Sequence, residues 1–165
     1  MTRFAITFFI LILITYVFVQ FTKNKETKII SPIPYSPAPT PQPDARIKLL
    51  EAFFYRYNSK LVLYAETFIR TADAEDLDWK LLPVVACVES SCGKFYRQNA
   101  FGWGSDKIDY GTDAQDIAGV ASRIASLSYY KTYNKTKDIY DFARAYNAPF
   151  AEDYYRKLTY FYRKI

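Results

Sequence analysis

Histidine is absent from the 165 residues of this chain. Without an imidazole, the chain has neither the Ser-His nor the Cys-His pair that activates a catalytic nucleophile. The most common ligand of catalytic zinc is missing as well. We therefore expect no metal site and no cofactor.

A basic run that would follow a phosphate backbone is also missing from the C-terminal part. Residues 1–43 hold four basic side chains and one acidic one, so they carry +3 of the formal net charge of +5. Residues 44–165 carry only the remaining +2 and are nearly balanced in charge. We expect no nucleic-acid partner.

Long hydrophobic runs are confined to one stretch, from Phe4 to Phe21, with 18 residues and no charge. At about 1.5 Å per residue, a helix of this length spans roughly 27 Å, which is enough for a bilayer core. A cleaved signal peptide is the alternative, but Val19, Gln20 and Phe21 are bulky where a signal peptidase requires small residues. We predict that residues 1–22 form a transmembrane anchor.

A linker follows at residues 23–43. Its first part is basic, and its second part, residues 31–43, is rich in proline. This composition predicts an extended polyproline II chain. At about 3.1 Å per residue, the proline-rich part reaches roughly 40 Å, enough to hold a folded domain away from a membrane.

Residues 44–165 are long enough for one domain, and their apolar pattern is helical. Apolar residues recur every three or four positions from Ile47 to Phe68, which predicts two helices broken near residues 57–60. Further helices are expected from Asp78 to about Gly93 and over residues 113–127, 138–147 and 150–165. A loop or short hairpin is expected at residues 104–113, and a polar connection at residues 129–137. We predict a mostly α-helical domain with a small loop or hairpin region.

The helix predicted to end near Gly93 carries one acid, Glu89, after the apolar residues 84–88. The negative end of the helix dipole disfavours an ionised carboxylate, and so would desolvation by the aromatic residues that come after it. Both effects raise the pKa of a carboxyl group, which suits a general acid. A solvated residue in the last turn of the helix is the alternative.

Glu-Ser-Ser-Cys-Gly-Lys at residues 89–94, followed by Asn-Ala-Phe-Gly-Trp-Gly at residues 99–104, resembles a pattern of the lysozyme-like glucosaminidases. These are peptidoglycan-cleaving domains, often described as endo-β-N-acetylglucosaminidase-like and related to lytic transglycosylases. Residues 72–83, which lead into the helix, and the turn at residues 146–149 resemble the same family. The resemblance implies a lysozyme-like helical fold for residues 44–165.

The resemblance also implies roles for individual residues. Glu89 stands where the family has its catalytic acid, Asn99, Phe101 and Gly102 stand where it lines the sugar cleft, and Tyr146 stands where a tyrosine faces that cleft. Aromatic rings stack against pyranose faces, although core packing is the alternative for each of them. The candidate substrate-binding residues are Ser90, Asn99, Phe101, Gly102, Trp103, Tyr110 and Tyr146.

Two questions stay open within the motif. A second carboxylate would come from Asp106, Asp109 or Asp113, but substrate assistance by an N-acetyl group, or capture by a sugar hydroxyl, needs only Glu89. Cys87 and Cys92 are too far apart for a disulfide on a straight helix, but the chain turns at Gly93. A disulfide and two buried thiols are both compatible with the sequence.

We predict a membrane-anchored glycosidase that cleaves β-1,4 bonds of peptidoglycan glycan strands, with Glu89 as general acid. Its partners would be these strands and, through the anchor, the membrane. The domain would lie outside the cytoplasm, although Lys23, Lys25 and Lys28 favour the opposite topology. The alternatives are a wall-binding or scaffold domain without chemistry, and a plain anchor whose helices pair with a protein partner. Absence of a cleft beside Glu89 would favour the plain anchor.

Overall fold

The computed structural model describes residues 44–96, 99–104 and 108–165. The predicted anchor at residues 1–22, the predicted linker at residues 23–43 and Asp106 lie outside the described residues. The described residues all belong to one compact unit, Gln42–Ile165. Within them, no helix is both long and apolar enough to cross a membrane.

The described part of the chain is mostly helical and contains no β-strand, in agreement with the predicted α class. Its elements, with η for short 3-10 helices, are α2 (Ala45–Arg56), η1 (Lys60–Tyr64), α3 (Ala65–Ala74), α4 (Leu81–Ser90), α5 (Asp113–Ser126), η2 (Ser128–Tyr130), α6 (Lys131–Thr136), α7 (Ile139–Tyr146), η3 (Ala148–Phe150) and α8 (Ala151–Tyr162). Asp44, Thr112 and Asp138 cap α2, α5 and α7, because each side chain accepts a hydrogen bond from a backbone N–H of the first turn.

The structure corrects the predicted start of α4 and the predicted connection at residues 129–137. The side chain of Asp78 accepts a hydrogen bond of 2.9 Å from the backbone N–H of Lys80, so it closes a turn before the helix rather than capping it. The connection contains η2 and α6, whose buried residues are Tyr130 and Tyr133. Two tyrosines give no aliphatic periodicity, which is why the sequence pattern did not predict this helix.

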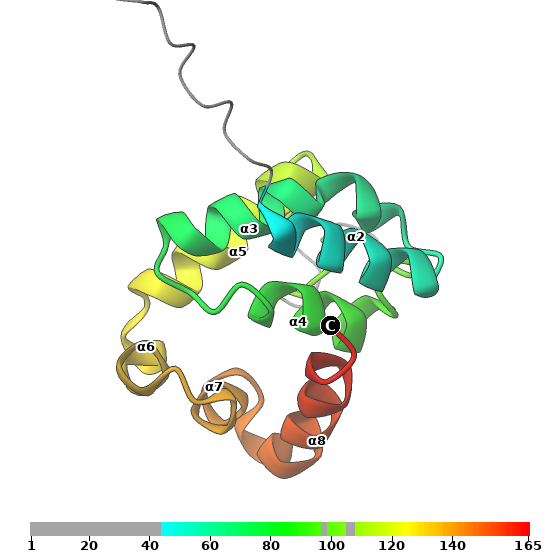
Figure 1. Cartoon of the computed structure of the whole chain (residues 1–165). Helices are drawn as coiled ribbons and strands as arrows, with labels where there is room; N and C mark the ends of the chain where they lie inside the picture. The colour runs from blue at the N-terminus through cyan, green and yellow to red at the C-terminus, as the bar shows by residue number, and fades with distance from the viewer. Residues whose placement is uncertain (1–43, 97–98, 105–107) are drawn as a thin grey trace, which may run out of the picture. The chain divides into compact units, whose positions relative to one another are not determined.

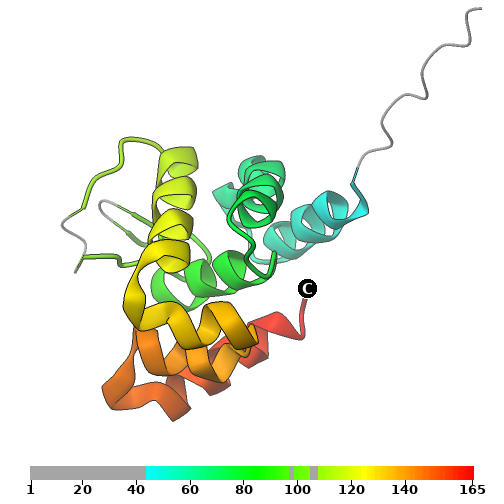
Figure 2. The ribbon, with the colours of Figure 1, turned by 90° about the vertical axis from the view of Figure 1, so that its left-hand side faces the viewer.

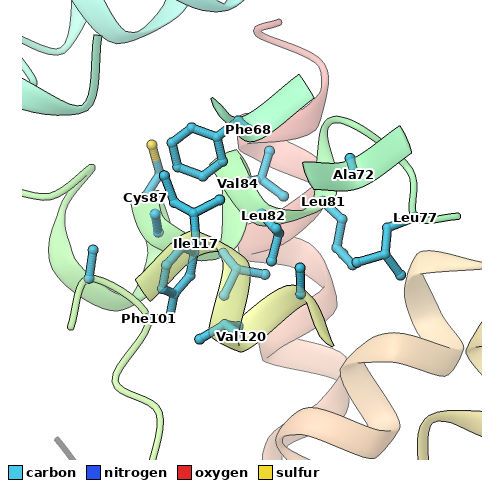
Figure 3. Packing of buried hydrophobic residues seen from close by; sticks show 14 of the residues in the cluster. Phe68, Ala72, Leu77, Leu81, Leu82, Val84, Cys87, Phe101, Ile117 and Val120 are labelled. Atoms are coloured by element: carbon cyan, nitrogen blue, oxygen red, sulfur yellow. The ribbon is translucent and has the colours of Figure 1, made fainter. Parts of the chain in front are cut away.

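Helix α4 lies between two groups of helices. Figures 1 and 2 show α2, α3 and α5 on one side of it and α6, α7 and α8 on the other. All residues from Leu81 to Cys87 are buried. Figure 3 shows this helix beside Phe68 of α3 and Ile117 of α5, which belong to the same hydrophobic cluster. Full burial of a large apolar side chain contributes about 1.5–3 kcal/mol, so these buried residues make α4 a main part of the hydrophobic core.

A row of aromatic rings connects α7 and α8. Tyr146 at the end of α7 packs against Phe142, with ring centroids 5.2 Å apart. On its other side, Tyr146 stacks against Tyr154 of α8, with centroids 5.3 Å apart and planes inclined by 4°. Because α8 also packs against α4, this row ends beside the last turn of the central helix.

Candidate active site

Helix α4 places Glu89 at the boundary between core and solvent. The first seven residues of the helix are buried, and so is its last residue, Ser90, whereas Glu89 is exposed. Glu89 is the only acidic side chain on this helix. The packing of α4 therefore fixes the direction in which one carboxyl group points.

The chain turns sharply just after Glu89. The sequence predicts this turn at Gly93, but in the structure it starts two residues earlier: Ser91, Cys92 and Gly93 have φ values of 54°, 59° and 74°, all left-handed. A disulfide joins Cys87 to Cys92 across the turn. The disulfide thus ties the end of the helix to its preceding turn, with Glu89 between the two cysteines.

Ser90 belongs to the helix end rather than to a substrate surface. It is only 3% exposed. Its hydroxyl donates a hydrogen bond of 2.7 Å to the carbonyl of Ala86 and accepts one of 2.9 Å from the backbone N–H of Gly93. The structure therefore corrects the expectation that Ser90 lines the cleft, because both of these bonds stabilise the turn.

The carboxyl group of Glu89 has a different neighbour at each oxygen. Tyr154 donates a hydrogen bond of 2.5 Å to Oε1. Oε2 lies beside the backbone of Gly102, where an added Cβ would be only 3.2 Å from it. The φ of +62° at Gly102 and this close approach both favour glycine. The two neighbours hold the carboxyl group in place, while the residue as a whole is exposed.

The surroundings of Glu89 raise the pKa of its carboxyl group above the ordinary value. Burial by the neighbouring groups is the largest cause, and the hydrogen bond from Tyr154 and the charge of Lys157 oppose it. The residue as a whole is nevertheless exposed, so the burial of the carboxyl group is partial. Burial also raises the pKa of Tyr154 and of Tyr146, so both hydroxyls stay protonated as donors at neutral pH.

Asn99 organises the loop that approaches Glu89. Its side chain is fully buried. Its Oδ1 accepts hydrogen bonds from the backbone N–H groups of Phe101 and Trp103, and its Nδ2 donates to the carbonyls of Trp103 and Ile108. The hydroxyl of Tyr146 donates to the carbonyl of Phe101 and ties the same loop to α7. These bonds place Gly102 against the carboxyl group of Glu89.

A cleft of about 440 Å³ begins at this loop. It is lined by Gly102, Trp103, Gly104, Tyr129, Tyr130, Ala145 and Tyr146. The Trp103 ring is 9% exposed and contacts the rings of Tyr130 and Tyr146, with centroids 6.0 and 5.6 Å apart. Glu89 is not one of the lining residues, and the cleft comes near its carboxyl group only at Gly102, which lines the cleft and lies against Oε2.

Of the other residues expected at the cleft, Asn99, Phe101 and Tyr110 do not line it, and the side chain of Asn99 is fully buried within the loop instead. The side chain of Phe101 is buried in the core against Phe68, with ring centroids 6.4 Å apart. The ring of Tyr110 covers α5 at Gly119, where an added Cβ would lie only 2.3 Å from it. Both rings are used for packing, so neither lines the cleft.

Of the three aspartates considered as a second carboxylate, the two in the described residues, Asp109 and Asp113, have partners. Asp109 accepts a hydrogen bond from the backbone N–H of Gly111. Asp113 accepts one from the hydroxyl of Tyr96 and lies 3.5 Å from Lys60. Among the described residues, no group of three or more acidic or cysteine side chains is placed to hold a metal ion.

Two residues of the site, Tyr154 and Tyr129, have no signal in the sequence that marks them as site residues. Tyr154 is 65 residues from Glu89, and the sequence shows it only as one residue of an amphipathic helix. Tyr129 belongs to the segment that was expected to be a polar connection. Neither position carries a local signal. The packing of α8 against α4 brings Tyr154 to the carboxyl group, and Tyr129 lies at the cleft as part of η2.

No protein-family model matches the chain, and no significant match to it was found among the curated proteins or the solved structures. The case for a function therefore rests on the motif around Glu89 and on the geometry described above.

Proposed function

We propose that residues 44–165 form a lysozyme-like domain that cleaves β-1,4 glycosidic bonds of peptidoglycan glycan strands. The observation that carries this proposal is the position of Glu89. Glu89 is an exposed residue whose carboxyl group accepts a hydrogen bond from Tyr154 and lies against Gly102, a residue that lines an aromatic cleft. The resemblance of residues 89–94 and 99–104 to the lysozyme-like glucosaminidases agrees with this assignment.

In the proposed reaction, protonated Glu89 acts as the general acid. A glycan strand lies in the cleft with a glycosidic oxygen at the open side of the carboxyl group. Glu89 gives its proton to this oxygen as the bond from the anomeric carbon breaks, which leaves an oxocarbenium-like sugar. The ionised Glu89 then takes a proton from the attacking water, or from a hydroxyl of the same sugar as in a lytic transglycosylase, and is restored.

A route without a second carboxylate fits the described residues better than one with it. Asp109 accepts a hydrogen bond from a backbone N–H. Asp113 accepts a hydrogen bond from Tyr96 and forms an ion pair with Lys60. We therefore propose that the N-acetyl group or a hydroxyl of the substrate stabilises the developing positive charge. Glu89 would then serve as acid and base in turn, oriented by Tyr154.

The proposal includes the cellular setting of the domain. Peptidoglycan lies outside the cytoplasm, so the domain would be extracytoplasmic, anchored by residues 1–22 and separated from the membrane by the linker. The disulfide between Cys87 and Cys92 agrees with an oxidising compartment.

Glu89→Gln tests the proposal directly. Glutamine keeps the size of the side chain and a carbonyl that accepts from Tyr154, but it delivers no proton. We expect release of glycan fragments from purified peptidoglycan, measured by mass spectrometry, to fall by about 10²–10⁴-fold or more. The melting temperature should stay close to that of the wild type.

Glu66→Gln is the matched control, because Glu66 is exposed on α3 and pairs with Arg70 on the same helix. This variant should retain full activity. Wild-type cleavage by Glu89→Gln would rule out the mechanism. If the wild-type chain binds glycan and releases no fragment, the domain is a wall-binding module instead.

A further inference from the structure

Asp116 is a buried carboxyl group that the proposed reaction does not use. It lies in the first turn of α5, which is labelled in Figure 1, and is only 2% exposed. Its Oδ1 is buried and has no hydrogen-bond partner among the described residues. Burial of an ionised oxygen without a partner is costly, because the oxygen loses its bonds to water. The neutral carboxyl group therefore suits this position better than the carboxylate.

Two other carboxylates lie close enough to act on Asp116. Burial is the largest cause that raises the pKa of Asp116, to about 6, and the negative charges of Asp113 on α5 and of Asp109 in the preceding segment add to it. When it is ionised, Asp116 is both desolvated and next to two like charges. A rise in pH through about 6 therefore works against the position that the side chain occupies.

The groups that favour ionised Asp116 are weaker. They are the backbone N–H of Tyr110, the charge of Lys60 and the N-terminal end of the helix dipole. Lys60 lies 3.5 Å from Asp113, and its ammonium group lies over the ring of Tyr96, 4.3 Å from the centroid. Burial raises the pKa of Tyr96 to about 12, so its hydroxyl is neutral. Because Lys60 is shared with Asp113, it does not neutralise Asp116.

Residues 108–112 lie against α5 beside this carboxyl group. The backbone N–H of Tyr110 faces Asp116. The ring of Tyr110 packs on the same helix one turn later, where a Cβ added at Gly119 would lie 2.3 Å from it. The segment is therefore held on α5 at two neighbouring points, of which one is a titratable group.

The same segment supports the cleft. A Cβ added at Gly104, which lines the cleft, would lie 2.6 Å from Cγ1 of Ile108. The carbonyl of Ile108 accepts a hydrogen bond of 3.0 Å from Nδ2 of Asn99. Asn99 in turn holds the loop that places Gly102 against Glu89. A movement of residues 108–112 would thus reach both the cleft and the carboxyl group of the proposed acid.

We infer that Asp116 is a positioning residue that holds residues 108–112 on α5 while it is protonated and releases them when it ionises. A carboxyl group whose pKa is raised in the held arrangement stabilises that arrangement at low pH, and this stabilisation is lost as the pH rises. Release of the segment loosens Ile108 and the loop at Gly102. The effect on cleavage rests on the proposed function, whereas the movement of the segment does not.

Amide hydrogen exchange of residues 108–112 tests this inference. The full chain in detergent is measured by mass spectrometry at about pH 5 and about pH 7.5, and the rates are corrected for the chemical rate of exchange. With a pKa of about 6 in the held segment and the ordinary value of 3.8 after release, the opening constant of the wild type should rise about tenfold. Above about pH 6 it should level off.

Asp116→Asn should remove this rise, since asparagine keeps the shape of the side chain and does not ionise. Asp73→Asn is the matched control. Asp73 is exposed on α3, and its hydrogen bonds with Arg46 keep its pKa below the ordinary value, so it is ionised at both pH values. This control should show the same rise as the wild type.

An opening constant that is equal at the two pH values in the wild type, or a rise that persists in Asp116→Asn, would overturn the inference. If Asp116→Asn does not fold, the wild type decides alone, because an opening constant that keeps rising above about pH 6 contradicts control by Asp116.

Cleavage provides the readout for the role in positioning. Between the same two pH values, kcat/KM for glycan cleavage should decline less in Asp116→Asn than in the wild type. An equal decline would show that the segment does not position the site. If the proposed function is wrong, the wild type releases no fragments at either pH, while the exchange of residues 108–112 still responds to pH.

Discussion

The carboxyl group of Glu89 is subject to opposing influences on its pKa. Burial against the aromatic residues raises it, and the Tyr154 hydroxyl and Lys157 lower it. The exposed face of the side chain still contacts water. A sugar bound there would remove that water and favour the protonated form further. In the proposed reaction, substrate binding itself would therefore prepare the general acid.

Tyr154→Phe tests this balance. The hydroxyl stabilises ionised Glu89, so its loss should raise the pKa of Glu89 further. A general acid acts below its pKa and loses activity as the pH rises through it. We therefore expect the alkaline limb of kcat/KM to move to higher pH, and the maximal rate to fall because the carboxyl group loses its fixed orientation.

Tyr155→Phe is the control for this experiment. Tyr155 is the next residue along α8, and its ring contacts Tyr140 edge-on rather than Glu89. Its pH profile should match that of the wild type. An alkaline limb that stays in place, or moves to lower pH, in Tyr154→Phe would mean that Tyr154 does not control the ionisation of Glu89.

The sequence predicts Glu89 as the acid of the site, but it does not predict the residues that hold its carboxyl group in place. Glu89 is visible because it follows an apolar run and precedes a glycine, which is a local pattern. The hydrogen bond from Tyr154 depends on how α8 packs against α4, and this contact between distant segments has no local pattern. The same holds for Asn99. The motif predicts that this residue belongs to the site, but its hydrogen bonds to the backbone of Trp103 and Ile108 are known only from the folded loop.

At the scale of elements, helix ends that depend on neighbouring residues follow from the sequence better than helix ends that depend on distant contacts. Asp44 and Asp138 cap α2 and α7 because short acceptor side chains bond the first turn, which is a property of neighbouring residues. The end of α4 depends on more distant residues. Ser59 donates a hydrogen bond of 2.5 Å to the carbonyl of Cys92, and Leu61 packs against Gly93. No pattern within the helix predicts these contacts.

Gly93→Ala tests how the end of α4 is built. The φ of +74° disfavours a side chain, and an added Cβ would lie 2.7 Å from Cγ of the buried Leu61. We expect a loss of about 2–3 kcal/mol in the free energy of unfolding, measured by urea denaturation. Ser91→Gly should act oppositely, because Ser91 is exposed at a φ of 54° and glycine relieves that strain.

The two variants together separate strain from packing. If Gly93→Ala is as stable as the wild type, Leu61 moves aside without cost and the turn is not tightly packed. If Ser91→Gly destabilises the domain, the side chain of Ser91 has a role that its exposed position does not indicate. Activity measured beside stability would then show whether a loosened helix end also misplaces Glu89.

At the scale of the whole molecule, the cleft is assembled from segments that are far apart in the chain. Residues 102–104 follow α4, residues 129–130 precede α6, and residues 145–146 end α7. Their convergence depends on the position of α4 between the two groups of helices (Figure 2). Sequence periodicity predicts the helical class, but it does not predict which helices become neighbours.

Residues 1–43 decide whether the proposed function is possible in the cell, because its substrate lies outside the cytoplasm. Lys23, Lys25 and Lys28 come directly after the hydrophobic run and favour a cytoplasmic position for the C-terminal domain. Arg3 precedes the run and Glu26 lies among the lysines, so the bias is small. The proposed substrate and the Cys87–Cys92 disulfide favour the opposite side.

Reporter fusions after Ile165 test this topology. We expect a reporter that is active only after export to give signal, and one that is active only in the cytoplasm to give none. Exchanging Lys23, Lys25 and Lys28 for glutamine should strengthen the export signal, since positive charge on that side opposes translocation. A matched exchange of Lys131 and Lys135, which lie more than 100 residues from the hydrophobic run, should change nothing. Signal from the cytoplasmic reporter alone would place the domain away from peptidoglycan and make glycan cleavage impossible for this chain.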